Sequence, residues 1–221
     1  MQLRDDATLD NFQASSAAEP VLHALKQQQL PAGEDIIFLH GAQGAGKSHL
    51  LQACCHLAGS GALYLSLSEL SDYAPEDVLA GIESLELVCL DDLQAVSGHA
   101  DWELALFSLY NRAREAGCRL VVAADAAPRT LAVDLPDLRS RLAWGIVFHL
   151  PSADDEGKRA ILQFRAGRRG LVLADEVASY IVSRAPRDLA QLLSLLDKLD
   201  HASLAQQRSL SIPFVRQTLG W

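Results

Sequence analysis

The segment from Gly41 to Ser48 has the residue types and the spacing needed to hold a chain of phosphates. It matches the P-loop pattern GxxxxGK[ST] and reads Gly41-Ala42-Gln43-Gly44-Ala45-Gly46-Lys47-Ser48. Glycines in such a loop let the backbone wrap around the phosphates, so that its N–H groups face the anion. Lys47 would place a positive charge near the β- and γ-phosphates, and the Ser48 hydroxyl would bind Mg²⁺. We therefore predict a binding site for ATP or ADP with Mg²⁺ over these residues, and include the next residue, His49, in it.

Carboxylates follow two of the apolar runs in the chain. Asp91 and Asp92 come directly after the run Leu85–Leu90, and Asp125 follows the run Arg119–Ala124. In a parallel sheet such strand ends meet at the edge where ligands bind. We expect Asp91 to hold Mg²⁺ through water, Asp92 to orient the attacking water, and Asp125 to sense the γ-phosphate or position water. A loop-capping role for Asp125 is the alternative.

The elements that must position these residues are short apolar runs alternating with helical patterns. This alternation is typical of βαβ units and predicts an α/β domain with a five-stranded parallel sheet. Because each run is nearly continuous in apolar residues, we expect helices to cover both faces of every strand. The predicted strands are Ile36–His40, Ala62–Leu67, Leu85–Leu90, Arg119–Ala124 and Ile146–Leu150.

Two helices of this α/β part have recognisable ends. One begins at Lys47 and is stopped by Gly59, and a second presents an apolar face that includes Trp102 and Leu109 before Gly117 stops it.

After Pro151 the strand pattern disappears. Ser152 and Asp155 resemble a capping box that opens a helix running toward Gly170. Two more helices are expected at about Asp175–Arg184 and Arg187–His201, with a short final one after Pro213. We therefore divide the chain into a nucleotide-binding α/β domain, residues 1–150, and a small all-helical lid, residues 151–221.

Composition limits the possible functions. Of the 221 residues 49% are apolar and 21% charged, as in an ordinary globular protein, and the net charge of −9 argues against a protein that grips DNA through a basic surface. The four cysteines form no CxxC pair and are expected in the core. The histidines, His49 and His56 among them, show no zinc-binding spacing. Neither a signal peptide nor a membrane span is recognisable, so we expect a cytoplasmic protein.

Three arginines are candidates for contacts with a nucleotide. Arg139 and Arg141 lie in LPDLRSRLAWG, and Arg187 lies in APRDL near the start of a predicted lid helix. An arginine supplied to a neighbour's nucleotide accelerates hydrolysis strongly in other NTPases. A surface arginine that is only solvated has the same appearance, so composition does not decide between the two.

Several segments together resemble a known family. In order and spacing, GAQGAGKSHLLQA, LVCLDDLQAVSG, LVVAAD, LPDLRSRLAWG and APRDLAQLLSLLDKLD resemble the AAA+ domain of the bacterial initiator DnaA. NRAREAG, SRLAWG and LSIPFVRQTLGW are similar to its short paralogues, the Hda family, which inactivate DnaA. The resemblance covers nearly the whole chain.

The resemblance implies roles for individual residues. Arg141 falls on the arginine-finger position, Arg187 on the sensor II position of the lid, and Asp125 on sensor I. The implied activity is docking on ATP-bound DnaA and promotion of its ATP hydrolysis, together with the DNA-loaded sliding clamp, so that replication does not restart. The helix-turn-helix domain that follows the lid in DnaA is not seen here, so no specific DNA binding is expected.

Clamp binding is in doubt on this pattern. Hda proteins carry a peptide of the QLxLPL type ahead of the segment that corresponds to RDDATLDNF, and here only Met1-Gln2-Leu3 precede it. The other function that the Asp91–Asp92 pair leaves open is a self-sufficient ATPase, a loader or remodelling motor that forms a homo-oligomer.

Overall fold

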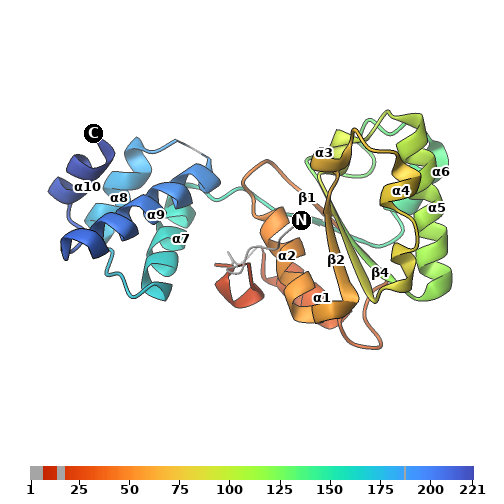
Figure 1. Ribbon diagram of the computed structural model, residues 1–221, viewed down its shortest axis with the longest axis horizontal. Coiled ribbons are helices and arrows are strands. Elements are labelled where there is room, and N and C mark those ends of the chain that lie inside the picture. The colour runs from red at the N-terminus through yellow and green to blue at the C-terminus, as the bar shows by residue number, and fades with distance from the viewer. Residues whose placement is uncertain (1–6, 14–17, 187) are drawn as a thin grey trace. The chain divides into compact units, whose positions relative to one another are not determined.

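The computed structural model describes residues 7–13, 18–186 and 188–221. They belong to two compact units, Met1–Pro151 and Ser152–Trp221 (Figure 1).

The first unit is built on five parallel strands in the order β2-β3-β4-β1-β5. The strands are β1 (Ile36–His40), β2 (Ala62–Ser66), β3 (Leu87–Asp91), β4 (Arg119–Ala124) and β5 (Ile146–His149). The predicted five-stranded parallel sheet is confirmed, and two strands, β1 and β4, have the predicted bounds. The chain crosses from β1 to its neighbour β4 only after forming β2 and β3, so the P-loop after β1 lies at a switch in strand order, where ligands bind in such sheets.

Helices pack on both faces of this sheet (Figure 1). One face, with Ile37 and Leu39 of β1, packs with α1 (Glu19–Gln28) and α2 (Lys47–Ala58) in one apolar core. The opposite face, with Phe38 and Val122, packs with α5 (Ala100–Ala116) and α6 (Pro136–Leu142) in a second core. Short helical elements complete the unit: η1 (Leu9–Asn11), η2 (Gly59–Gly61), α3 (Leu67–Leu70), α4 (Pro75–Val78), η3 (Ile82–Ser84) and η4 (Leu93–Ala95).

The predicted stops of two helices are confirmed. Gly59 follows α2, and Gly117 ends α5 in the left-handed conformation at φ 74°. All four cysteines are buried free thiols, as predicted.

The prediction that helices cover both faces of every strand is wrong for β5. Ile146 is 37% exposed and Val147 is 38% exposed, whereas every residue of β3 is buried. The physical reason is the place of β5 in the sheet, because among the described residues this edge strand pairs with β1 alone. An apolar run by itself does not reveal whether a strand is central or at the edge.

The second unit is all helical and has its own core. Leu162, Ile181, Leu196 and Phe214 meet there. Its helices are α7 (Asp155–Arg168), α8 (Asp175–Arg184), α9 (Leu189–Gln206) and α10 (Ile212–Leu219). The predicted bounds of α8 are confirmed. Within the described ranges, no helix is both long enough and apolar enough to span a membrane.

The helix ends of this unit correct three predictions. The cap of α7 is Asp154 and not Ser152, and Asp154 Oδ1 accepts the Gly157 N–H at 2.8 Å. The reason is that an N-cap side chain must directly precede the first helical turn to reach its N–H groups. α9 continues past His201 to Gln206. α10 begins before Pro213, which is tolerated in a first turn, where no N–H partner is needed.

Candidate nucleotide-binding site

The P-loop lies between β1 and α2, the position that its chemistry requires. Gly46 is the N-cap of α2, and Lys47 and Ser48 form the first turn. The first N–H groups of a helix have no partner within the helix, and the positive end of its dipole attracts anions. The loop and this helix end therefore have the geometry and the partial positive charge that could hold a phosphate.

Two glycines of the loop are required by its geometry. Gly46 has φ 97°, and a Cβ there would lie 2.7 Å from Cε2 of Phe12. A Cβ on Gly41 would lie 2.2 Å from the carbonyl oxygen of Leu150. A side chain at either position would push the loop away from its neighbours.

Lys47 is directed into the loop. Its Nζ donates to the carbonyl oxygens of Gly41 at 2.6 Å and Ala42 at 3.0 Å, and the residue is 7% exposed. Burial lowers the pKa of Lys47, and three nearby carboxylates oppose that shift. They belong to Asp91, Asp92 and Asp125. The structure thus brings together the lysine of the P-loop and the three carboxylates predicted at the strand ends.

Asp91 is fully buried at the end of β3. Its Oδ2 accepts a hydrogen bond from Tyr64 Oη at 2.7 Å, and its Oδ1 accepts the Asp92 N–H at 3.0 Å. Burial raises the pKa of Asp91, and hydrogen bonds from Ser48 and Tyr64 oppose the rise. The bond to Ser48 joins the two predicted Mg²⁺ ligands.

Hydroxyl and carboxylate oxygens are the hard donors that Mg²⁺ prefers, and Mg²⁺ usually takes few protein ligands beside phosphates and waters. Ser48 and Asp91 fit that requirement. In the part of the chain that the structure describes, there is no cluster of three or more His, Cys, Asp or Glu residues that could hold a metal without such help.

Asp92 follows β3 in the left-handed conformation, with φ 58° and ψ 44°. Its Oδ2 accepts from Ser68 Oγ at 3.0 Å, and its Oδ1 accepts from Gln94 Nε2 at 3.0 Å. A non-glycine residue with positive φ is uncommon and is often found at functional sites. Asp125 lies after β4, and its N–H donates to Gln94 Oε1 at 3.1 Å.

His49 contacts the N-terminal segment. Its Nε2 lies 2.9 Å from the carbonyl oxygen of Thr8, and its ring centre is 5.8 Å from that of Phe12. Phe12 also approaches Gly46. The predicted phosphate-site residue therefore also anchors η1 and the segment that follows it to the P-loop helix.

Arg141 lies on α6, and its contacts are with α5 and the segment after α6. Its Nε donates to Asn111 Oδ1 at 3.1 Å, and its guanidinium lies 3.6 Å from the Trp144 ring centre and 5.5 Å from that of Phe107. Arg139 points elsewhere and donates to the carbonyl oxygen of Val133. The structure therefore does not bring Arg141 to its own P-loop. Arg187, the predicted lid residue, lies outside the described residues.

Other polar residues of the site follow no recognisable pattern in the sequence. Gln94 and Ser68 contact Asp92, and His40 and His149 pair at the carboxyl ends of β1 and β5 with ring centres 5.0 Å apart. Burial lowers the pKa of His40, and His149 and Lys47 lower it further. In the LDDLQ segment the pattern identifies only the two carboxylates. Isolated Ser, Gln and His residues have no characteristic spacing from which a role could be predicted.

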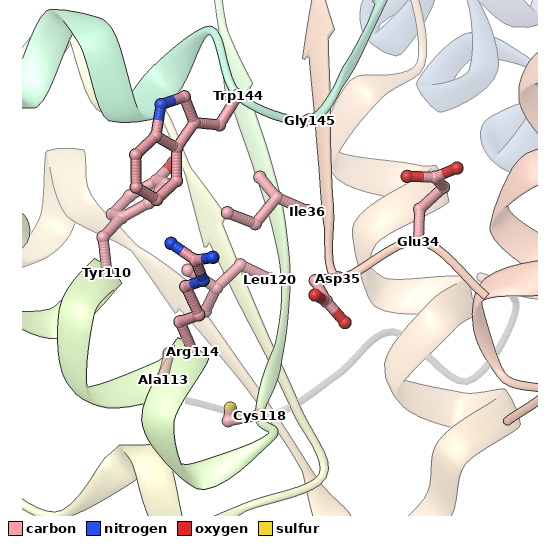
Figure 2. Close-up of a pocket in the computed structure, with 10 residues that line it drawn as sticks. All are labelled: Glu34, Asp35, Ile36, Tyr110, Ala113, Arg114, Cys118, Leu120, Trp144 and Gly145. Carbon is pink, nitrogen blue, oxygen red and sulfur yellow. The ribbon is translucent and has the colours of Figure 1, made fainter. Parts of the chain in front are cut away.

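A separate hollow of about 350 Å³ lies at the opposite edge of the sheet (Figure 2). Ile36 begins β1 and Leu120 lies near the start of β4, so this hollow is at the amino edge of the sheet, away from the P-loop. Arg114 lines it, with its guanidinium 4.9 Å from the Trp144 ring centre. The lining residues are Glu34, Asp35, Ile36, Tyr110, Ala113, Arg114, Cys118, Leu120, Trp144 and Gly145. None of the predicted site residues is among them.

Each of the two units matches the model of a known protein family. Residues 3–149 match the bacterial DnaA ATPase domain, and residues 155–219 match the lid domain of Hda. The chain is 43% identical over 219 residues to an uncharacterised protein of Haemophilus influenzae, a match that covers 97% of this chain and 94% of that protein.

Solved structures show the same fold. Domain III of the replication initiation protein DnaA from Thermotoga maritima superposes with a TM-score of 0.82 at 22% identity, covering 100% of this chain and 98% of that one. DnaA from Aquifex aeolicus bound to AMPPCP superposes with a TM-score of 0.75 at 24% identity, covering 89% of this chain and 66% of that one. The predicted AAA+ fold with a helical lid is confirmed.

Proposed function

The chain belongs to the family of bacterial DnaA ATPase domains and carries an Hda lid domain, and from this we propose that it is a nucleotide-binding regulator of replication initiation. It docks on ATP-bound DnaA and promotes hydrolysis of the ATP that DnaA holds. Residues 1–150 serve as the nucleotide-binding domain and residues 151–221 as the lid.

The P-loop binds ADP or ATP with Mg²⁺. Residues 41–48 cradle the phosphates, Lys47 turns its ammonium from the carbonyl oxygens of Gly41 and Ala42 to a phosphate, and Ser48 with Asp91 would hold the metal. Bound Mg²⁺ neutralises charge on the β- and γ-phosphates. Solved DnaA structures that bind AMPPCP support this reading. His49 contributes by holding the N-terminal segment against the loop.

The position of Arg141 is the observation that carries the proposal. Its Nε is bonded to Asn111 and its face is stacked on Trp144, while its other guanidinium nitrogens have no hydrogen-bond or ion-pair partner among the described residues. Those nitrogens form a planar pair of donors suited to phosphate oxygens. The contacts of Arg141 lie on α5 and around Trp144, and within the described part of the chain none of them is with its own P-loop. Arg141 therefore serves a nucleotide that is bound by a partner.

The proposal also covers the lid arginine, the sliding clamp, DNA and the location of the protein. Arg187 is proposed to contact the chain's own nucleotide from the lid; it immediately precedes Asp188, the cap of α9. Clamp association remains a proposal from the family, since Met1-Gln2-Leu3 lie outside the described residues. We propose no sequence-specific DNA contact, because the net charge is −9. A cytoplasmic location follows from the proposed role.

Steady-state hydrolysis tests the proposal. The purified chain is assayed alone, with ATP-bound DnaA, and with DnaA plus clamp-loaded DNA. Hydrolysis that appears only in the mixtures, and that is lost when Arg141 is replaced, supports the regulator.

A self-sufficient ATPase is the second candidate, favoured by the two side-chain hydrogen bonds that hold Asp92 near Lys47. Fast turnover by the chain alone, rising with its own concentration, would identify a homo-oligomeric motor and contradict the regulator.

A further inference from the structure

Gln94 joins two carboxylate-bearing strand ends that the sequence places 33 positions apart, at Asp92 and Asp125. Its Nε2 donates to Asp92 Oδ1 at 3.0 Å, and its Oε1 accepts the backbone N–H of Asp125 at 3.1 Å. The end of β3 is thereby tied to the end of β4, directly beside the P-loop lysine.

The chemistry of this bridge requires an amide. A carboxylate only accepts and a backbone N–H only donates, so the bridging side chain must offer one donor and one acceptor at the same time. The carboxamide of Gln does so with one planar group, and Gln94 reaches both partners at hydrogen-bonding distance. The orientation of the Gln94 amide is therefore determined by its two partners.

The same network fixes the direction of Asp92. Ser68 Oγ donates to Asp92 Oδ2 at 3.0 Å and lies 2.9 Å from Ser66 Oγ, at the end of β2. Each carboxylate oxygen of Asp92 has used one acceptor site, which leaves a second site on each oxygen for a water or another donor. Gln94 and Ser68 thus hold the left-handed Asp92 in one position without blocking its function as an acceptor.

We propose that Gln94 is a positioning residue that couples Asp92 to Asp125, so that the site distinguishes a nucleoside triphosphate from a diphosphate. A γ-phosphate that contacts the β4 end shifts the Asp125 backbone, and Gln94 transmits that shift to the Asp92 carboxylate. A diphosphate lacks the phosphate that reaches the β4 end, so its binding by residues 41–48, with Mg²⁺ held by Ser48 and Asp91, leaves the Asp125 backbone in place. This inference rests on the proposed nucleotide-binding function.

Replacement of Gln94 by Glu separates the two bonds. In Gln94→Glu the acceptor for the Asp125 N–H remains, whereas the donor to Asp92 is replaced by a second negative charge. Affinities for Mg²⁺-ADP and for a non-hydrolysable Mg²⁺-ATP analogue are measured by calorimetry. We expect ADP affinity within about threefold of wild type and the ratio of the two affinities changed by about fivefold or more. Gln27→Glu, an exposed position on α1, is the control for the added charge.

A double variant tests geometry against charge. Combining Asp92→Asn with Gln94→Glu restores a hydrogen bond between the two positions with donor and acceptor exchanged, and removes the added charge. We expect the double variant to recover the affinity ratio of the wild type. Thermal unfolding of all variants is followed in parallel, because a residue needed only for folding would lower the melting temperature and both affinities together.

The outcomes separate the inference from the proposed function. If the wild type binds neither nucleotide, the P-loop function fails. If the wild type binds both and Lys47→Ala loses both, but Gln94→Glu has the wild-type affinity ratio, the function stands and the coupling role of Gln94 is wrong. An equal loss of both affinities in Gln94→Glu would also overturn the coupling role.

Discussion

Arg141 and Asn111 are joined by a hydrogen bond of 3.1 Å from Nε of the arginine to Oδ1 of the asparagine. The bond fixes one edge of the guanidinium to α5, and the Trp144 ring supports one of its faces. A cation that is held in place before it meets phosphate loses less conformational freedom on contact, so more of the interaction stabilises the transition state.

Arg141→Ala should impair the partner's reaction and leave the chain's own nucleotide site intact. We expect stimulated ATP hydrolysis on DnaA to fall about tenfold to a thousandfold, while affinity for ADP stays within a few-fold. Arg141→Lys should restore little of the stimulated hydrolysis that Arg141→Ala loses, because an ammonium lacks the planar pair of donors of a guanidinium. Single-turnover hydrolysis and calorimetry measure the two quantities. If loss of bound ADP is the main defect, the trans role is wrong.

Lys47→Ala should abolish most nucleotide binding. The ammonium is buried beside the loop, and its removal leaves the phosphates without their nearest positive charge. We expect a loss of about tenfold or more in ADP affinity, equivalent to about 1.4 kcal/mol. Lys26→Ala, on the exposed side of α1, is the control. Unchanged ADP affinity in Lys47→Ala would remove the P-loop assignment.

Direct DNA affinity should be weak and should fall steeply with salt. The net charge of −9 disfavours the approach of a DNA backbone that is itself negatively charged. Filter binding at low and at physiological salt, with specific and scrambled duplexes, measures it. Tight and sequence-selective binding at physiological salt would contradict this expectation.

The parts of the site that sequence predicts are those that local chemistry determines. A phosphate cradle needs glycines, lysine and serine at fixed spacing between a strand and a helix, so Gly41 to Ser48 could be recognised along the chain. Asp91 and Asp125 end apolar runs and could be placed at one edge of the sheet by topology alone.

The residues that orient those groups could not be predicted in this way. Gln94 contacts a backbone N–H 31 positions away, and Glu103 bonds to N–H groups at a similar distance along the chain. Such contacts arise from tertiary packing and leave no periodicity in the sequence. The exposure of β5 could not be predicted for the same reason, because whether a strand lies at an edge depends on the order of strands in the whole sheet.

Glu103 on α5 is the anchor of the segment that leads into α6. Although only 2% exposed, its carboxylate accepts the N–H of Gly98 at 2.7 Å, of Asp134 at 3.0 and 3.1 Å, and of Leu135 at 2.7 Å. Leu135 is the N-cap of α6, the helix that carries Arg141. The helix start is thus capped by a side chain from a different helix, and this contact sets where Arg141 lies.

The ionised form of Glu103 is the one that the fold prefers. Burial by itself raises the pKa of Glu103, but the backbone N–H groups of Gly98, Leu135 and Asp134, together with Arg139, outweigh burial and bring it below the ordinary value of 4.5. A carboxyl group whose pKa is depressed by folding stabilises the fold fully above its unfolded pKa. That stabilisation is lost as the pH falls from about 4.5 through the folded pKa.

Glu103→Gln should therefore destabilise the α/β unit in a way that depends on pH. The glutamine amide has the same shape as the carboxylate, but its NH₂ group is a donor and would face backbone N–H groups that are also donors. We therefore expect the free energy of unfolding at pH 7 to fall by about 3 kcal/mol. The difference from wild type should narrow below pH 4.5, where the wild type loses its own carboxylate. Glu115→Gln, exposed on the same helix, is the charge control. Urea unfolding of the α/β unit at pH 7.5 and pH 3.5, followed by tryptophan fluorescence, measures the effect. Because α6 loses its anchor, stimulation of DnaA should also fall while ADP affinity is kept. If Glu103→Gln lowers the free energy of unfolding equally at pH 7.5 and pH 3.5, the charge of Glu103 is not what holds this segment.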